Sequence, residues 1–335
     1  MKKAFVFLGF LLLGFLFFIL TLWSVDFNKT ISFLTEFPFW AYLLIIFILA
    51  FNLLIVAIRW KIIVEKNSNK KVSLFNLFLF KLSGYSISYV TPAALVGGEP
   101  FRIYFLREIE KISLSKATTS VVIDKIIDIS AFVIMILFGF FWAAKSHINF
   151  GFSIVLNVAF IFIVSSFFLF FISIVRGDML LTRLFRRLKI FKIKFLYRLE
   201  EPLEKVEKEM SIFFQNNTKK LIVIIILSLA SLSLVLLENF LVIYALGIEM
   251  NFGENLIFTA IPCLFYFVPI PGAFGTYELA RNSIFYAFGL NVEIALASSI
   301  ATRFRDFLFI IFGFIYASRH GVKMLHKEFK GQKKL

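Results

Sequence analysis

The chain has 335 residues, of which 60% are hydrophobic and 48 are phenylalanine, and its mean hydropathy is +0.89. No soluble domain of this length needs so many apolar residues, so the composition excludes a soluble protein and predicts an integral membrane protein. The net charge of +15 is typical of cytoplasmic loops that follow the positive-inside rule, and we expect no nucleic-acid partner. Cys263 is the single cysteine, which excludes an intramolecular disulfide and a cysteine-cluster metal site.

Six apolar runs are each long enough to cross the hydrocarbon core of a bilayer, which takes about 20 residues of helix. These runs are 4–23, 38–58, 117–142, 151–175, 220–246 and 293–318. The first run follows Lys2 and Lys3, and no small-residue cleavage site comes after it. We therefore expect an uncleaved first helix rather than a signal peptide.

Basic residues are distributed unevenly between these runs. The connections after the second and fourth runs and the C-terminal tail are rich in Lys and Arg, whereas the connections 24–37, 143–150 and 247–254 are poor in them. The positive-inside rule then places both termini in the cytoplasm of a multi-pass protein of the cell membrane. The tail, 319–335, is expected to be a basic cytoplasmic segment.

Two further apolar stretches, 74–96 and 255–290, cannot each cross the membrane once without inverting the charge pattern downstream. Each contains Pro and Gly, which allow a turn within the membrane. We expect two re-entrant helical hairpins, the first opening to the cytoplasm and the second to the outside.

The order of elements repeats along the chain. Three spans and a hairpin in residues 1–142 are followed by three spans and a hairpin in residues 151–318, in inverted orientation. The sequence thus predicts one integral membrane domain, 1–335, that is all-α, with about six transmembrane helices and two re-entrant hairpins in an inverted repeat, as in many secondary transporters. The insertion 176–219 is expected to form one or two amphipathic helices on the cytoplasmic surface.

A short motif occurs once in each half. Pro92 is followed by Glu99 and Arg102, and Pro271 is followed at the same spacings by Glu278 and Arg281. Each motif places a half-helix after a Pro and Gly break, and a helix N-terminus inside the membrane favours an anion such as a lipid phosphate. An alternative role for each Glu–Arg pair is a structural clasp within its hairpin. The residues expected to shape the hairpin backbone are Pro92, Gly97, Gly98, Pro269, Pro271, Gly272 and Gly275.

Further charges lie within the predicted spans, where ionisable side chains are costly and are expected to be paired. The offset of 179 residues between the two motifs relates Asp124 to Arg303 and Arg59 to Glu238. We therefore expect pairing across the two halves, although snorkelling to the surface is the better interpretation for Arg59 and for Lys81. The candidate substrate-binding residues are Glu99, Arg102, Asp124, Asp128, Glu278, Arg281, Arg303 and Glu238.

Signals for catalysis are absent from the sequence. The three histidines are peripheral and far apart, and there is no Walker sequence or aspartate-x-aspartate motif. We expect no catalytic residue, no metal and no cofactor.

Three segments resemble a known family. Residues 96–102 (VGGEPFR), 124–128 (DKIID) and 269–278 (PIPGAFGTYE) are similar to the membrane domain of lysylphosphatidylglycerol synthase, the multiple peptide resistance factor. They are equally similar to stand-alone flippase-like membrane proteins of bacteria and archaea. The resemblance implies a domain that moves aminoacylated lipid between leaflets. The soluble aminoacyltransferase domain of the synthase has no counterpart in this chain, so we expect a transporter rather than an enzyme.

The sequence therefore predicts a membrane lipid transporter. Its expected cargo is a phospholipid, an aminoacylated phospholipid or a polyprenyl-phosphate-linked sugar, and its partners are membrane lipids with anionic headgroups. One alternative is a subunit that presents a lipid to a separate glycosyl- or aminoacyltransferase, and another is a proton-coupled transporter of small solutes or ions. The sequence leaves open whether the chain forms a homo-oligomer.

Overall fold

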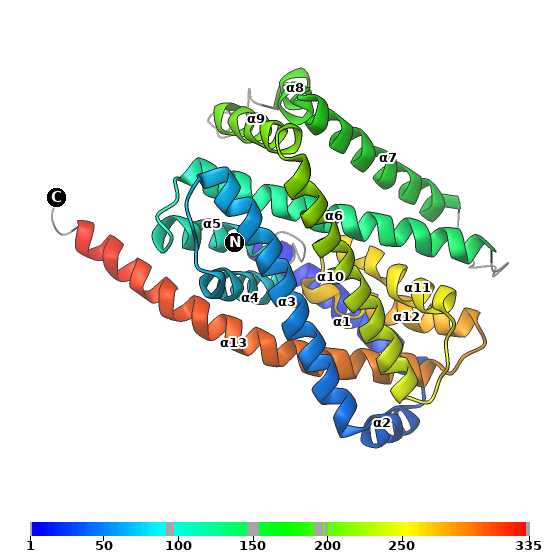
Figure 1. Cartoon of the computed structure of the whole chain (residues 1–335). Helices are drawn as coiled ribbons and strands as arrows, with labels where there is room; N and C mark the ends of the chain where they lie inside the picture. Colours follow the sequence, from blue (N-terminus) through cyan, green and yellow to red (C-terminus); the bar gives the residue numbers. More distant parts are fainter. Residues whose placement is uncertain (1, 92–96, 146–153, 191–196, 198–199, 333–335) are drawn as a thin grey trace.

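The computed structural model describes the chain except residues 1, 92–96, 146–153, 191–196, 198–199 and 333–335. Among the described residues the regular structure is helical, with no strand (Figure 1). Helix is the expected state for long apolar segments, because in hydrocarbon each backbone N–H and C=O must bond within its own segment. The all-helical fold predicted from the sequence is confirmed.

The first half of the chain begins with a sharp bend between its first two helices. The axes of α1 and α2 differ by 90°. Asp26 caps α2 by accepting hydrogen bonds from the backbone N–H groups of Asn28 and Lys29, and its own N–H donates to Glu293 Oε1 at 3.1 Å. The helices of this half are α1 (Lys2–Trp23), α2 (Phe27–Glu36), α3 (Phe39–Ser68), α4 (Leu74–Val90), α5 (Glu99–Glu108) and α6 (Leu114–Lys145).

The second half contains the predicted insertion, whose described residues include the α-helices α8 and α9. Its second helix, α9, buries Met210 and Phe213 in one core cluster with Val121 of α6, so it is packed into the protein rather than solvated. The helices of this half are α7 (Ile154–Arg176), α8 (Leu180–Arg187), α9 (Glu200–Gln215), α10 (Thr218–Ala245), α11 (Phe252–Ala260), η3 (Pro262–Phe267), η4 (Pro271–Ala273), α12 (Thr276–Ala287) and α13 (Val292–Gln332). Residues 319–332 of the expected basic tail continue α13 as helix.

Each predicted hairpin is a helix, a break and a second helix that packs back on the first. In the first hairpin α5 packs against α4, and in the second α12 packs against η3 and α11. The half-helix expected after the first break is α5, which begins at Glu99, so the segment that packs back on α4 extends beyond the expected limit at residue 96. α5 carries several charged residues and was therefore not expected to be buried, but it buries Arg102 together with Phe105 and Leu106.

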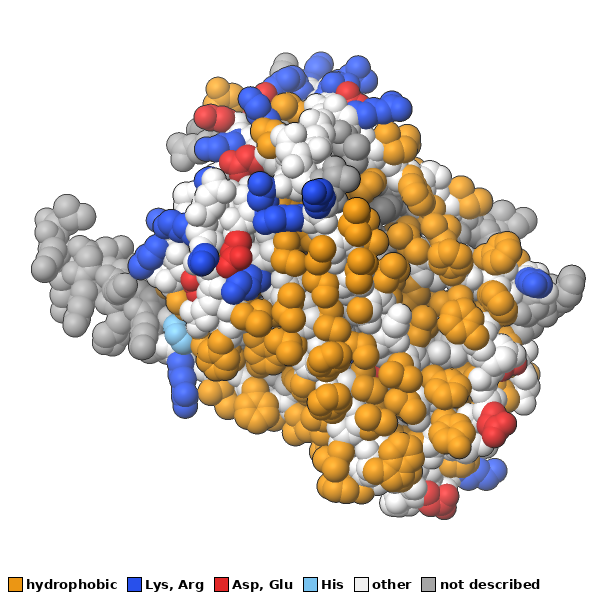
Figure 2. Space-filling view, viewed as in Figure 1, with side chains coloured by type: hydrophobic (Ala, Val, Ile, Leu, Met, Phe, Trp, Pro, Cys, Tyr) orange, Lys and Arg blue, Asp and Glu red, His pale blue; other side chains and the backbone are white. Residues whose placement is uncertain are grey.

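Within the described residues, three helices, α3, α6 and α10, are long and apolar enough to cross a membrane, or four if the bent pair α1–α2 counts as one span. They coincide with the predicted runs 38–58, 117–142 and 220–246. The run 293–318 lies in α13, where Arg303, Arg305 and Asp306 interrupt the apolar sequence. Figure 2 shows a broad apolar surface over the middle of the molecule, with basic side chains gathered over α8 and α9. Apolar area this extensive on the surface indicates contact with lipid or protein.

The two halves interlock through glycines. α4 of the first half packs along α13, and α11 of the second packs along α6. A Cβ at Gly313 would overlap Ser86 Oγ, and a Cβ at Gly139 would lie 2.7 Å from Cβ of Ala260, so neither crossing has room for a side chain. α3 and α10 lie beside each other, and Ser231 donates a hydrogen bond to Asn52 Oδ1 at 2.6 Å.

Candidate functional site

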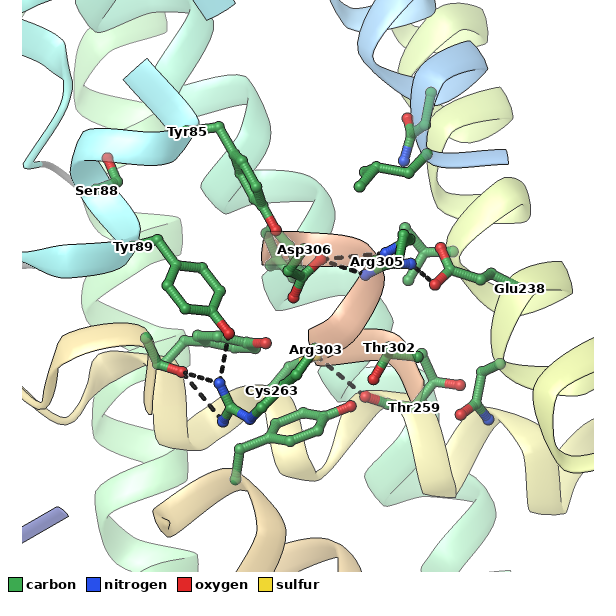
Figure 3. Close-up of a pocket in the computed structure, with 18 of the residues that line it drawn as sticks. Tyr85, Ser88, Tyr89, Glu238, Thr259, Cys263, Thr302, Arg303, Arg305 and Asp306 are labelled. Carbon is green, nitrogen blue, oxygen red and sulfur yellow. Dashed lines mark hydrogen bonds and ion pairs between the residues drawn. The ribbon is translucent and has the colours of Figure 1, made fainter. Parts of the chain in front are cut away.

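A cavity of about 320 Å³ lies between the two halves of the chain (Figure 3). Helices α3, α4 and α6 form its wall on one side, and α10, α11, η3, α12 and α13 form the other. The wall is mostly apolar but includes three arginines and two carboxylates. These charged residues are Arg281, Arg303, Arg305, Glu238 and Asp306.

Arg303 of α13 joins three elements of the wall. Its guanidinium is ion-paired with Glu278 of α12 and donates to Tyr89 Oη of α4 at 2.5 Å and to the carbonyl of Gly272 at 3.3 Å. Glu278 also accepts a hydrogen bond from Gly275 N at 2.8 Å, so the same carboxylate closes the N-terminus of α12. Arg303 is therefore a tether between the hairpin and the long last helix.

Arg305 lies between two carboxylates. It is ion-paired with Glu238 of α10 and with Asp306 at 2.6 Å. In Figure 3 the side chain of Tyr85 points from α4 toward Asp306. Two acidic groups beside one arginine give this part of the cavity a negative charge that a cationic group could balance.

Arg281 differs from the other two arginines because, among the described residues, no carboxylate lies within ion-pair distance of it. Its side chain is 2% exposed, its Nη1 donates to Tyr277 Oη at 3.0 Å and its Nη2 donates to Asn239 Oδ1 at 2.6 Å. Its Nε has no partner. A buried charge without a counter-charge is costly, so an anion in the cavity would stabilise this guanidinium.

A second charged cluster lies in the first half and is fully ion-paired around one carboxylate. Asp124 is 0% exposed, and its two oxygens contact Arg59 at 2.9 Å, Lys81 at 2.5 Å and Arg102 at 2.5 Å. Asp128 adds a second carboxylate to Arg59 and Lys81. The guanidinium of Arg102 stacks 4.0 Å from the ring centroid of Trp60, a favourable cation–π arrangement.

The eight predicted site residues therefore divide into two groups. Glu238, Arg281 and Arg303 line the cavity, and Glu278 supports it through Arg303. The other four belong to the first-half cluster, where Glu99 pairs with Lys125 at 3.0 Å. These four residues are Glu99, Arg102, Asp124 and Asp128.

Several expected interactions of these charges were wrong. Asp124 does not pair with Arg303, nor Arg59 with Glu238, because each half balances its charges from its own helices. Equivalent positions of a repeat touch each other only where they lie on its axis. Arg59 and Lys81 do not snorkel; their side chains are 1% and 8% exposed, because Asp124 and Asp128 neutralise them inside the protein.

The hairpin motifs also differ from the expectation in one respect. Glu278 is not a clasp for Arg281, since its ion-pair partner is Arg303, whereas Glu99 does lie 4.0 Å from Arg102.

The predicted hairpin residues shape the two breaks in different ways. Gly272 and Gly275 have φ values of +56° and +80°, which favour glycine. Gly98 donates to Ser88 Oγ at 2.8 Å, and a Cβ there would overlap the backbone of Gly84. A Cβ at Gly97 would overlap Thr91. Pro269 lies two residues after the end of η3 at Phe267, and Pro271 begins η4. Pro92 lies outside the described residues.

Sequence reasoning missed the tyrosines of the cavity. Tyr85 and Tyr89 stand one helical turn apart on α4, and Tyr277 supports Arg281. Hydroxyl groups at i, i+4 in an otherwise apolar hairpin are a signal that could have located them. Within the described part of the chain, no group of three His, Cys, Asp or Glu residues could hold a metal ion.

Comparison with known proteins relates nearly the whole chain to one family. Residues 6–313 match the family described as "Lysylphosphatidylglycerol synthase TM region". The chain is 24% identical over 302 residues to UPF0104 membrane protein PH1989 of Pyrococcus horikoshii, covering 86% of this chain and 89% of the relative. It is also 24% identical over 287 residues to UPF0104 membrane protein MJ1595 of Methanocaldococcus jannaschii, covering 82% and 83% of the two chains. No solved structure matches.

Proposed function

The chain belongs to the Lysylphosphatidylglycerol synthase TM region family and is a multi-pass membrane protein, and on this basis we propose that it moves a phosphate-headgroup lipid between the leaflets of the cell membrane. The proposed cargo is a phospholipid, an aminoacylated phospholipid or a polyprenyl-phosphate-linked sugar. A lipid moving between leaflets needs polar groups that shield its headgroup from hydrocarbon, and the cavity between the halves offers five charged side chains in a mostly apolar wall.

The observation that carries the proposal is the buried Arg281, which faces the cavity without a carboxylate partner among the described residues. A guanidinium offers a planar pair of donors that suits phosphate oxygens. Asn239 and Tyr277 hold it in place and, being neutral, leave its charge uncompensated. A headgroup with both charges would place its phosphate at Arg281 and an amine near Glu238 and Asp306.

Paired interactions in the two halves support the inverted repeat that the proposal includes. In the first half Arg59 of α3 pairs with Asp124 of α6. In the second half the charges are reversed, and Glu238 of α10 pairs with Arg305 of α13, two residues after the position that the motif offset relates to Asp124. Ser231 and Asn52 are 179 residues apart, which is the offset of the two motifs, and they contact each other. Contact between equivalent residues is expected on a twofold axis.

The interlocking glycines provide a matching packing contact in each half. Gly139 and Gly313 are separated by the same number of residues as Ser86 and Ala260, 174 in both cases (313 − 139 and 260 − 86), which differs from the motif offset of 179, so the two halves correspond in how their helices pack and not residue by residue. Gly139 of the first half packs against α11 of the second, and Gly313 of the second half packs against α4 of the first.

In the arrangement that we propose, there are six spans and two re-entrant hairpins, with both termini in the cytoplasm.

Single cysteines in a Cys263→Ser background test this topology with an impermeant thiol reagent. We expect external labelling at Lys29 and Asn251 and none at Lys66. External labelling at position 66 would contradict the proposed orientation.

Transport is tested in proteoliposomes that contain fluorescent lipids of identical chains and different headgroups, with leaflet-resolved quenching as the readout. We expect the wild-type protein to accelerate movement of the lipids that carry phosphate. Arg281→Lys should reduce the rate although it retains the charge, because Lys lacks the planar pair of donors. Binding of lipid without transport would favour a subunit that presents lipid to a transferase, and no binding would contradict the proposal.

A further inference from the structure

A second cavity, of about 330 Å³, lies between α6, α7, α8 and α9, and no residue of α7, α8 or α9 lines the central cavity. Its wall is apolar and includes Val122 of α6, Phe170 of α7 and Val206 of α9. It is separate in position from the site proposed for transport.

The two polar residues of this wall are engaged with other partners. Thr118 Oγ1 donates to the carbonyl of Leu114 at 2.8 Å. Glu207, which is 4% exposed, accepts hydrogen bonds from the backbone N–H groups of Leu181 at 2.9 Å and Thr182 at 3.0 Å, and from the hydroxyl of Thr182. The cavity therefore offers carbon surface to an occupant. A space about ten times the ~30 Å³ of a water molecule, with so few polar partners, suits an apolar group rather than water.

Glu207 also fixes the position of α8 above the cavity. Its carboxylate accepts the N–H groups at the start of this helix, where a negative charge is favoured by the helix dipole. α8 then places Leu181 and Phe185 in the cavity wall.

The outer surface of α8 and the residues after it are basic. Arg183, Arg187 and Lys189 are exposed, and no described carboxylate lies within ion-pair distance of them. Arg186 differs, because it pairs with Glu200 at 2.8 Å. Figure 2 shows basic side chains gathered over α8 and α9. Basic residues beside an apolar surface attract anionic lipid headgroups.

We propose that this cavity holds an acyl chain of an anionic phospholipid whose headgroup binds Arg183, Arg187 and Lys189. The lipid reaches the cavity from the bilayer side, where α7 exposes Leu169 and Ile172. An anionic headgroup fits better than a zwitterionic one, because these three cations have no counter-charge within the described residues. The bound lipid would be a resident component of the protein and not the transported cargo.

Native mass spectrometry of the purified protein tests this proposal after incubation with phosphatidylglycerol or phosphatidylcholine of identical chains. The wild-type protein should retain phosphatidylglycerol and little phosphatidylcholine. Arg183→Gln/Arg187→Gln should lower phosphatidylglycerol retention roughly tenfold or more, as expected for the loss of two basic contacts with an anionic lipid. The matched control, Lys66→Gln/Arg319→Gln, removes two exposed basic residues outside the cavity and should leave retention unchanged.

A second variant tests the acyl-chain position. Val206→Trp fills the cavity and should reduce retention of phosphatidylglycerol. Because no residue of α9 lines the central cavity, the same variant should move lipid between leaflets at the wild-type rate in proteoliposomes, so that failure here is distinguishable from failure of the proposed transport site. Equal retention of the two lipids by the wild-type protein would overturn the proposal. A measured mass equal to two copies of the chain, instead of one chain with bound lipid, would also overturn it. The Arg183→Gln/Arg187→Gln variant changes exposed residues alone, so it decides the question even if Val206→Trp does not fold.

Discussion

The carboxylate of Asp124 is expected to be the most sensitive charged position in the first half of the protein. Asp124→Asn would preserve the shape of the side chain and remove its charge. Arg59 and Lys81 would then keep Asp128 as their carboxylate partner, and Arg102 would keep Glu99 at 4.0 Å. Buried cations without counter-charges are strongly unfavourable, and the residue is 0% exposed, so water cannot replace the lost partner.

The size of the effect follows from the number and length of the ion pairs. Two unit charges about 3 Å apart attract by roughly 5–6 kcal/mol at an effective dielectric constant of about 20, and desolvation offsets much of this. Removing one partner of a buried pair typically costs about 3–5 kcal/mol. Since the carboxylate of Asp124 is ion-paired with three cations, we expect Asp124→Asn to lower the free energy of unfolding by an amount at or above the upper end of that range.

Thermal unfolding of the purified variants in detergent measures this loss. Asp124→Asn should unfold at a markedly lower temperature than the wild-type protein. Adding Lys81→Met to Asp124→Asn removes one of the cations that have lost Asp124 as a partner, so the double variant should recover part of the lost stability. Arg186→Gln, at an exposed ion pair, is the control and should change little. An unfolding temperature for Asp124→Asn equal to that of the wild type would refute the reasoning.

Two further predictions concern the contact between the halves. Gly139→Ala and Gly313→Ala should each destabilise the protein by about 1–3 kcal/mol through overpacking, whereas Gly9→Ala, whose Cβ meets nothing within 4 Å, should be neutral or slightly stabilising in thermal unfolding; equal behaviour of all three would contradict the close crossings. Glu278→Gln and Arg303→Gln should each lower stability, and the double variant should lose less than the sum of the single losses by about 0.5–3 kcal/mol; strictly additive losses would show that this ion pair is not formed.

Much of the architecture could be predicted from the sequence because its causes are local. Apolar runs and their Pro and Gly interruptions predict the helices and the two breaks, and α3, α6 and α10 lie where the runs predict them. The recurrence of the Pro–Glu–Arg spacing identified Arg281 as a candidate binding residue, and it lines the cavity.

The partners of the buried charges could not be predicted in the same way. The offset between the motifs relates positions, but contact depends on the crossing of α3 with α6 and of α10 with α13, which no local pattern encodes. Arg59 and Lys81 stand near the ends of apolar runs, where snorkelling is the usual outcome. Their burial depends on Asp124 and Asp128, which approach from another helix.

The central claim is that Arg281 binds the phosphate of a lipid in transit. The most direct measurement is the initial rate at which an anionic fluorescent phospholipid moves between leaflets in vesicles with equal amounts of wild-type protein, Arg281→Ala protein or no protein. We expect a rate above the protein-free background for the wild type and a rate near that background for Arg281→Ala, with equal unfolding temperatures for the two proteins. Equal rates for the wild type and Arg281→Ala would contradict it.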